Sequence, residues 1–153
     1  MEMRGGTRDL ARINVNLQRM LSLLLTVLQS PPVNHNPLEF RLRLILTEEQ
    51  DVLRRTLRLA QQQSFATGEF QTLIAIIYRD DEVAQLTVRE WIRASTWARS
   101  ADRDSLVQME HRFAQMRRQL ELIVPELTQI FGVAQMRYIV PAKYRDPPLE
   151  VTR

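Results

Sequence analysis

Cysteine is absent from the 153 residues of this chain, and glycine occurs only four times. The lack of cysteine excludes disulfide frameworks, thiol nucleophiles, iron–sulfur clusters and cysteine-ligated zinc sites. Glycine lies well below its usual ~7%, which disfavours glycine-rich phosphate loops and turn-dense β folds. A chain of ~150 residues has the length of one domain and can bury enough surface to fold without a disulfide or a structural metal.

Lysine is almost absent as well. Lys143 is the single lysine among 21 basic residues, and with 18 acidic residues the formal net charge is +3. Mixed charges with a small net value are typical of an ordinary solvated surface. The arginine excess has two interpretations: a GC-rich genome, or selection for anion and interface contacts, because the guanidinium presents five donors in a planar fork.

Long hydrophobic runs are also lacking. The longest apolar run, over residues 20–28, is interrupted by Ser22 and Thr26, and a helix that spans a bilayer needs ~20 apolar residues. The polar N-terminus does not resemble a secretory signal. We therefore expect a cytoplasmic protein with no membrane partner, and a virion or another large assembly is an equally compatible location.

Apolar residues recur at spacings of three and four along most of the chain, which predicts an all-α fold. Four long helices are expected, over residues 8–30, 36–64, 68–98 and 101–131. A kink is expected between residues 79 and 87. Pro125 should kink or restart the fourth helix, and Gly132 is a candidate C-cap.

The predicted architecture is an antiparallel up-down-up-down four-helix bundle over residues 1–132, followed by an extended C-terminal tail over 133–153. Three strand alternatives stay open at this point. Residues 39–46 alternate between apolar and polar like a strand, and so do residues 136–140. The stretch 73–78 is rich in isoleucine and could also be a strand. A tail of this kind either packs back on its own bundle or contacts a neighbouring subunit.

The sequence shows no pattern of residues that is typical of a catalytic, metal-binding or cofactor-binding site. His35 and His111 are the only histidines, and Glu110, next to His111, points about 100° away on a helix, so the two cannot share a di-iron ligand set. The acidic clusters at 48–51 and 80–82 are interpreted as helix starts that complement the helix dipole. No catalytic, metal-binding or cofactor-binding residue is predicted, and the chain is expected not to be an enzyme.

The leading prediction is a non-catalytic interaction or assembly module that acts as a homo-oligomer or as a small subunit of a larger complex. Trp91 belongs to the apolar stripe of the third helix, so Trp97, six residues later, is expected to be exposed or at an interface, where aromatic anchors concentrate binding energy. The predicted protein interface consists of Trp97, Met136, Tyr138, Ile139 and Tyr144.

Two alternatives remain. Arginines four residues apart on one helix repel each other by ~0.2–0.5 kcal/mol, and an anionic partner would relieve that cost. A basic nucleic-acid-binding subunit is therefore the second hypothesis, with its contacts at Arg54, Arg58, Arg89, Arg93, Arg117 and Arg118. The third hypothesis is an adaptor or effector-associated domain in bacterial defence or signalling, which would use the same surfaces as the first.

Overall fold

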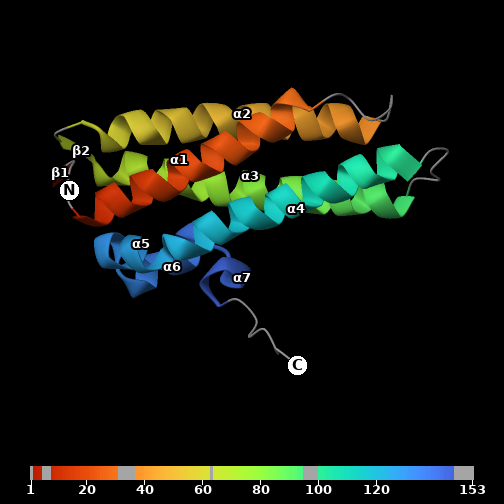
Figure 1. Cartoon of the computed structure of the whole chain (residues 1–153). Coiled ribbons are helices and arrows are strands. Elements are labelled where there is room, and N and C mark those ends of the chain that lie inside the picture. The colour runs from red at the N-terminus through yellow and green to blue at the C-terminus, as the bar shows by residue number, and fades with distance from the viewer. Residues whose placement is uncertain (1, 5–7, 31–36, 63, 95–99, 147–153) are drawn as a thin grey trace.

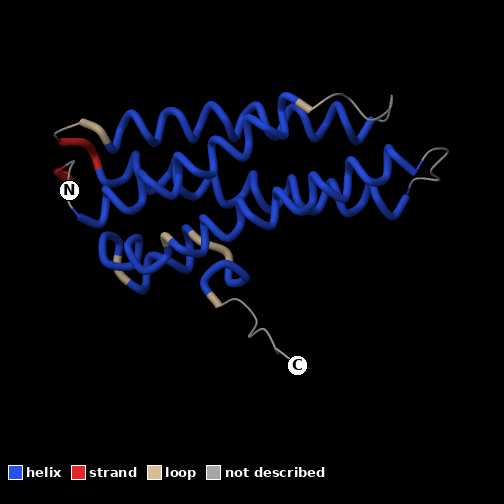
Figure 2. Tube along the Cα trace, viewed as in Figure 1, coloured by secondary structure: helices blue, strands red, loops and turns tan. Residues whose placement is uncertain are grey.

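The computed structural model describes residues 2–4, 8–30, 37–62, 64–94 and 100–146, and these form a bundle of helices (Figures 1 and 2). Its long helices are α1 (Arg8–Gln29), α2 (Pro37–Ala60), α3 (Thr67–Ala94) and α4 (Ser100–Leu122). Helices α1 and α3 each pack against both α2 and α4. The predicted all-α bundle is confirmed, and the up-down-up-down order stays a prediction.

Both α2 and α3 run without interruption. The strand alternative over 39–46 is wrong because Leu42 and Leu46 are buried at helical spacing, while Phe40 and Leu44 are exposed. Pro37 at the first helical position and Glu39 in the first turn favour the start of α2. Residues 79–87 lie inside α3, so the helix does not break there.

A small two-stranded sheet was not predicted. Strand β1 (Glu2–Arg4) pairs antiparallel with β2 (Ser64–Ala66), and Met3 lies opposite Phe65. Helix α2 consequently ends at Ala60 rather than near residue 64. The Phe65 side chain is buried, with its ring centroid 5.5 Å from that of Phe70 on α3, so β2 is held against the start of that helix.

Pro125 and Gly132 act as the sequence predicts. Helix α4 ends at Leu122, and α5 (Val124–Phe131) restarts with Pro125 in its first turn, where its missing N–H leaves no hydrogen bond unmade. Gly132 ends α5 with a φ of 83°, and its N–H donates to the Thr128 carbonyl at 2.8 Å. A side chain would disfavour that positive φ.

The extended tail is wrong for residues 133–146. This segment folds into α6 (Val133–Ile139) and α7 (Ala142–Arg145), so the strand alternative over 136–140 is wrong as well. The physical reason is burial: Met136, Ile139 and Tyr144 enter the core of the bundle. Of the two expectations for the tail, packing back on its own bundle holds for these residues. The rest of the tail, 147–153, lies outside the described residues.

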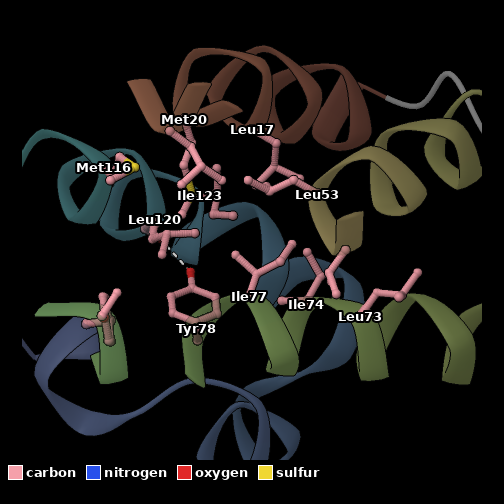
Figure 3. Close-up of a cluster of buried hydrophobic side chains, with 14 of the residues drawn as sticks. Leu17, Met20, Leu53, Leu73, Ile74, Ile77, Tyr78, Met116, Leu120 and Ile123 are labelled. Atoms are coloured by element: carbon pink, nitrogen blue, oxygen red, sulfur yellow. Dashed lines mark hydrogen bonds between the residues drawn. The ribbon is translucent and has the colours of Figure 1, made fainter. Parts of the chain in front are cut away.

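Two side chains form hydrogen bonds with backbone carbonyls of a neighbouring helix. Figure 3 shows Tyr78 of α3 among buried aliphatic and methionine side chains, with its O–H donating to the Leu120 carbonyl of α4. Arg43 of α2 donates to the carbonyls of Leu28 and Ser30, both at 2.7 Å, at the end of α1. The last carbonyls of a helix have no partner within that helix, so Arg43 of α2 helps to cap the end of α1.

Candidate interaction surfaces

Large apolar side chains are exposed on the outer face of the α2–α3 pair. The exposed fractions are 70% for Phe40, 57% for Leu44, 40% for Val83 and 53% for Leu86. Scattered single apolar residues are normal on a protein surface, but a group of them indicates a binding site. We refer to these four residues as the α2–α3 face.

An ion pair fixes how the two helices are aligned on this face. Arg79 of α3 lies 3.5 Å from Glu48 of α2, and both side chains are more than half exposed. The pair therefore marks the solvent side of the α2–α3 contact. Leu44 lies one turn before Glu48 and Val83 one turn after Arg79, so in an antiparallel pair the two apolar side chains are level with each other.

A groove of about 480 Å³ separates α3 from the segment that contains α6. Ile76 of α3 and Ile139 and Val140 of the α6 segment contribute apolar surface, and Arg79 and Tyr138 also line the groove. Because Tyr138 is 82% exposed, it has the position that the sequence predicted for an interface aromatic.

The other predicted interface residues that the structure describes are buried. Met136, Ile139 and Tyr144 are at most 3% exposed, so their assignment to a partner surface is corrected: they hold α6 and α7 on the bundle. Their hydrophobic character matched an interface and a core equally well, and the structure places them in the core. Trp97 lies outside the described residues.

The predicted nucleic-acid contacts do not form one surface. Arg58 lies in the last turn of α2 and Arg93 in the last turn of α3. Since α3 starts beside the end of α2 and has 28 residues, the Arg54–Arg58 and Arg89–Arg93 pairs are roughly 30 Å apart at ~1.5 Å per residue. On α4, the carboxylate of Glu121 lies 3.1 Å from Arg117 and 3.7 Å from Arg118, which partly neutralises both.

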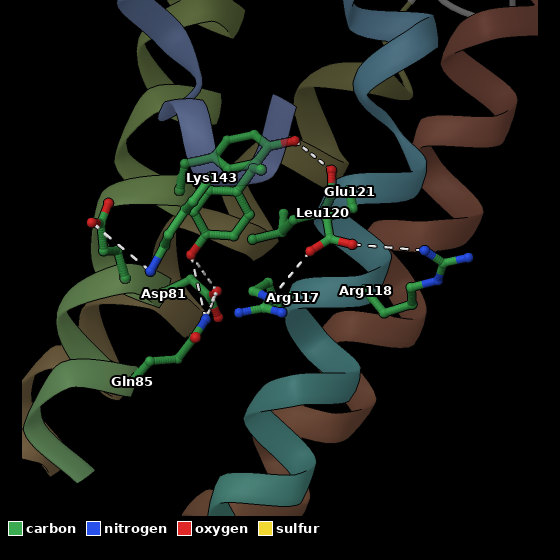
Figure 4. A network of polar contacts seen from close by, with 10 residues as sticks. Asp81, Gln85, Arg117, Arg118, Leu120, Glu121 and Lys143 are labelled. Atoms are coloured by element: carbon green, nitrogen blue, oxygen red, sulfur yellow. Dashed lines mark hydrogen bonds and ion pairs between the residues drawn. The ribbon is translucent and has the colours of Figure 1, made fainter. Parts of the chain in front are cut away.

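Three carboxylates are buried between α2, α3 and their neighbours: Glu49, Asp80 and Asp81. The Asp81 Oδ2 atom accepts hydrogen bonds from the Tyr144 O–H at 2.8 Å and from the Gln85 amide at 2.7 Å (Figure 4). Glu49 is fully buried, and neither of its oxygens has a hydrogen-bond partner among the described residues. The interpretation of these acids as helix starts is wrong, because they lie in the middle of α2 and α3.

Burial controls how these groups ionise. It raises the pKa of Glu49 well above its usual range, and the Asp81 and Asp80 charges raise it further. Burial also raises the pKa of Asp81 to about 6, although the hydrogen bonds from Tyr144 and Gln85 oppose this shift. For Asp80, burial and then the Glu48 charge raise the pKa to about 6. Burial therefore favours the protonated, neutral form of the Glu49 side chain.

The spacing of the apolar stripes could have revealed this cluster. The stripe of α2 passes from Leu46 to Leu53, and that of α3 from Ile77 to Ala84, with Glu49 and Asp81 at the intervening inward positions. In the part of the chain that the structure describes, no group of three or more histidine, aspartate or glutamate side chains is arranged to hold a metal ion.

Comparison of the chain with protein-family models, with curated proteins and with solved structures returned no match. Among the described residues, no helix is both long enough and apolar enough to cross a membrane.

Proposed function

We propose that this protein is a non-catalytic assembly module that self-associates through the α2–α3 face. The observation that carries the proposal is the exposure of four large apolar side chains on the same outer face. They present on the order of 400 Å² of apolar surface, within the ~300–600 Å² of the largest patch on a typical monomer. A specific interface buries ~800 Å² per partner, of which somewhat more than half is apolar.

The charges around this face favour a second copy of the chain as the partner. One end carries Glu48 of α2 and Arg79 of α3. The other end carries Arg41 of α2 and Glu90 of α3, both exposed and without a partner in the described part of the chain. Each end thus has one acid and one base, on opposite helices.

A two-fold axis in the interface can run along the helices or across them. In the first case Glu48 meets Arg79 of the second copy, and in the second case it meets Arg41 of the second copy. Both arrangements bring opposite charges together while the apolar centres face each other. This self-complementarity supports a homodimer over an interface with an unrelated protein, whose charges would have to match independently.

The test is the mass in solution of the whole chain and of a Leu44→Glu/Leu86→Glu double variant, by light scattering over a concentration series. We expect a dimer for the native chain and a monomer with unchanged helicity for the double variant. Val133→Glu is the matched control, because Val133 is 73% exposed but lies on α6, and it should remain dimeric. A native chain that stays monomeric at high concentration would contradict the proposal, as would a double variant that still dimerises.

A further inference from the structure

A small pocket lies between α3 and α4. Two arginines from different helices line it, Arg89 of α3 and Arg117 of α4. It has a volume of about 120 Å³, and it is lined by Gln85, Arg89, Glu110, His111, Phe113, Ala114 and Arg117. We propose that this pocket binds a small dianionic oxyanion: inorganic phosphate or the terminal phosphate of a phosphomonoester. The inference is independent of self-association, since none of these residues belongs to the α2–α3 face.

The guanidinium groups of Arg89 and Arg117 have hydrogen-bond donors that no described residue accepts from. Arg89 is exposed and forms no ion pair or hydrogen bond with any described residue. The Arg117 Nε faces Glu121 at 3.1 Å, so its two terminal amino groups remain available for another acceptor. Because Arg89 and Arg117 both line the pocket, their like charges repel each other, and a bound anion would offset that repulsion. Arginine is well suited to this task because its fork matches phosphate oxygens.

The pocket is held in shape from behind. Gln85, only 5% exposed, donates its amide N–H to Asp81 at 2.7 Å and lies 3.4 Å from the Tyr144 hydroxyl. In Figure 4, Arg117 reaches from α4 toward Asp81 and Gln85 on α3. A side chain fixed in this way keeps the inner wall of the pocket in place before any ligand arrives, which reduces the ordering cost of binding.

Size and charge favour a terminal phosphate over a nucleic-acid backbone. A water molecule takes up ~30 Å³ in the liquid, so the pocket has room for a single tetrahedral oxyanion but not for a nucleotide chain. A phosphodiester carries one negative charge and a substituent on two sides, whereas a terminal phosphate carries up to two charges and can enter end-on. Glu110 is the one acid among the lining residues, and Glu121 pairs with Arg117 from outside the pocket. Arg89, which has no acidic partner among the described residues, supplies the positive charge that is free for a bound anion.

The experiment titrates the whole chain with inorganic phosphate, with glycerol phosphate and with a short single-stranded oligonucleotide, at constant ionic strength set with chloride. Calorimetry measures the affinity, and the rise in melting temperature with ligand checks it independently. We expect saturable binding of one phosphate or phosphomonoester per chain. Arg89→Gln should weaken this binding at least tenfold, because a charge-assisted hydrogen bond is lost at a site that the substitution leaves folded.

Arg93→Gln is the matched control, because Arg93 is an exposed arginine one turn further along α3 that does not line the pocket; it should change the affinity less than twofold. Tighter binding of glycerol phosphate than of phosphate would identify a phosphomonoester as the ligand, and the reverse would identify the free ion. The proposal is overturned if neither binds, if both arginine variants weaken binding equally, or if the oligonucleotide alone binds.

Discussion

The buried residues of α1 are all apolar, whereas α2 and α3 bury the carboxylates of Glu49, Asp80 and Asp81. The buried residues of α1 are Leu10, Ile13, Leu17, Met20, Leu24 and Val27. Glu49 and Asp81 occupy equivalent inward positions on α2 and α3 and are just as inaccessible to water. The same helical spacing and the same depth of burial therefore have opposite energetic consequences in α1 and in the α2–α3 pair.

The two regions differ in what their burial contributes. A buried leucine or isoleucine contributes ~1.5–3 kcal/mol to folding at any pH. A buried carboxylate without a full set of partners must keep its proton or suffer a large loss of hydration. The inward side of α1 therefore sets the stability of the bundle, while the α2–α3 carboxylates make that stability depend on pH.

The largest effect is expected from a cavity on the α1 side. Leu17 is fully buried, and Leu17→Ala should lower the free energy of unfolding by about 2–5 kcal/mol through lost burial and the cavity left behind. Chemical denaturation at pH 5 and at pH 8 would measure it, and the loss should be the same at both. A loss that differed strongly between the two would contradict the division of roles between the regions.

The next effect is the pH dependence of the native protein. Because burial raises the pKa of Asp81 from its ordinary value to about 6, the folded chain retains a proton that the unfolded chain has already released. Stability from this group is complete below the unfolded pKa and is lost as the pH rises through about 6. From pH 5 up to about pH 6 this loss is roughly 1.4 kcal/mol, one pH unit at about 1.36 kcal/mol per unit. Asp80, whose pKa is also raised to about 6 by burial and then by the Glu48 charge, contributes a similar amount. The native protein should thus be on the order of 2–3 kcal/mol more stable at pH 5 than at pH 8.

Glu49→Gln sharpens this prediction, since glutamine resembles the protonated acid but cannot ionise. The variant should be more stable than the native protein at pH 8 and equal to it at low pH, so its stability curve should be flatter. Asp51→Asn is the matched control, because Asp51 lies on the same helix but is exposed, with a side chain 68% accessible; it should leave the curve nearly unchanged. Equal curves for Glu49→Gln and the native protein would contradict the buried-carboxylate interpretation.

The smallest effect on the free energy of unfolding is expected from loss of the hydrogen bond between Tyr144 of α7 and Asp81. Tyr144→Phe removes the hydrogen bond of 2.8 Å to Asp81 and keeps the ring contact with Tyr78. We expect a loss of about 1–2 kcal/mol at pH 8, with faster amide hydrogen exchange in α7. Tyr138→Phe should change neither quantity, because Tyr138 is exposed. If both substitutions behaved alike, the hydrogen bond would contribute nothing.

The sequence predicted the long helices because their apolar spacing repeats over many turns. It failed for α6, whose seven residues are too few to establish a period and which is stabilised by burial of Met136 and Ile139 against the bundle. The β1–β2 pair escaped prediction for a related reason: its strands lie far apart in sequence, and a three-residue strand has almost no pattern. Local spacing identifies an element only when the element is long enough to repeat it.

The surfaces were harder to predict than the fold. Of the residues predicted for the interface, Tyr138 is exposed, whereas Met136 and Tyr144 have equally hydrophobic side chains and lie inside. The α2–α3 face was not predicted, because Phe40 and Leu44 also fit the apolar–polar alternation of a strand and their exposure on a helix was not considered. Glu49 and Asp81 were missed because acidic residues are rarely expected at inward positions, although each fills a gap in an otherwise regular stripe.

Arg43 has a consequence for how this chain can change during evolution or engineering. Because it binds the last carbonyls of α1 from the neighbouring helix, the end of α1 depends on a residue that lies 13 to 15 positions further along the chain. A substitution at position 43 therefore acts on two helices at once. Lysine, a point charge without a planar fork, could not replace the two hydrogen bonds of Arg43.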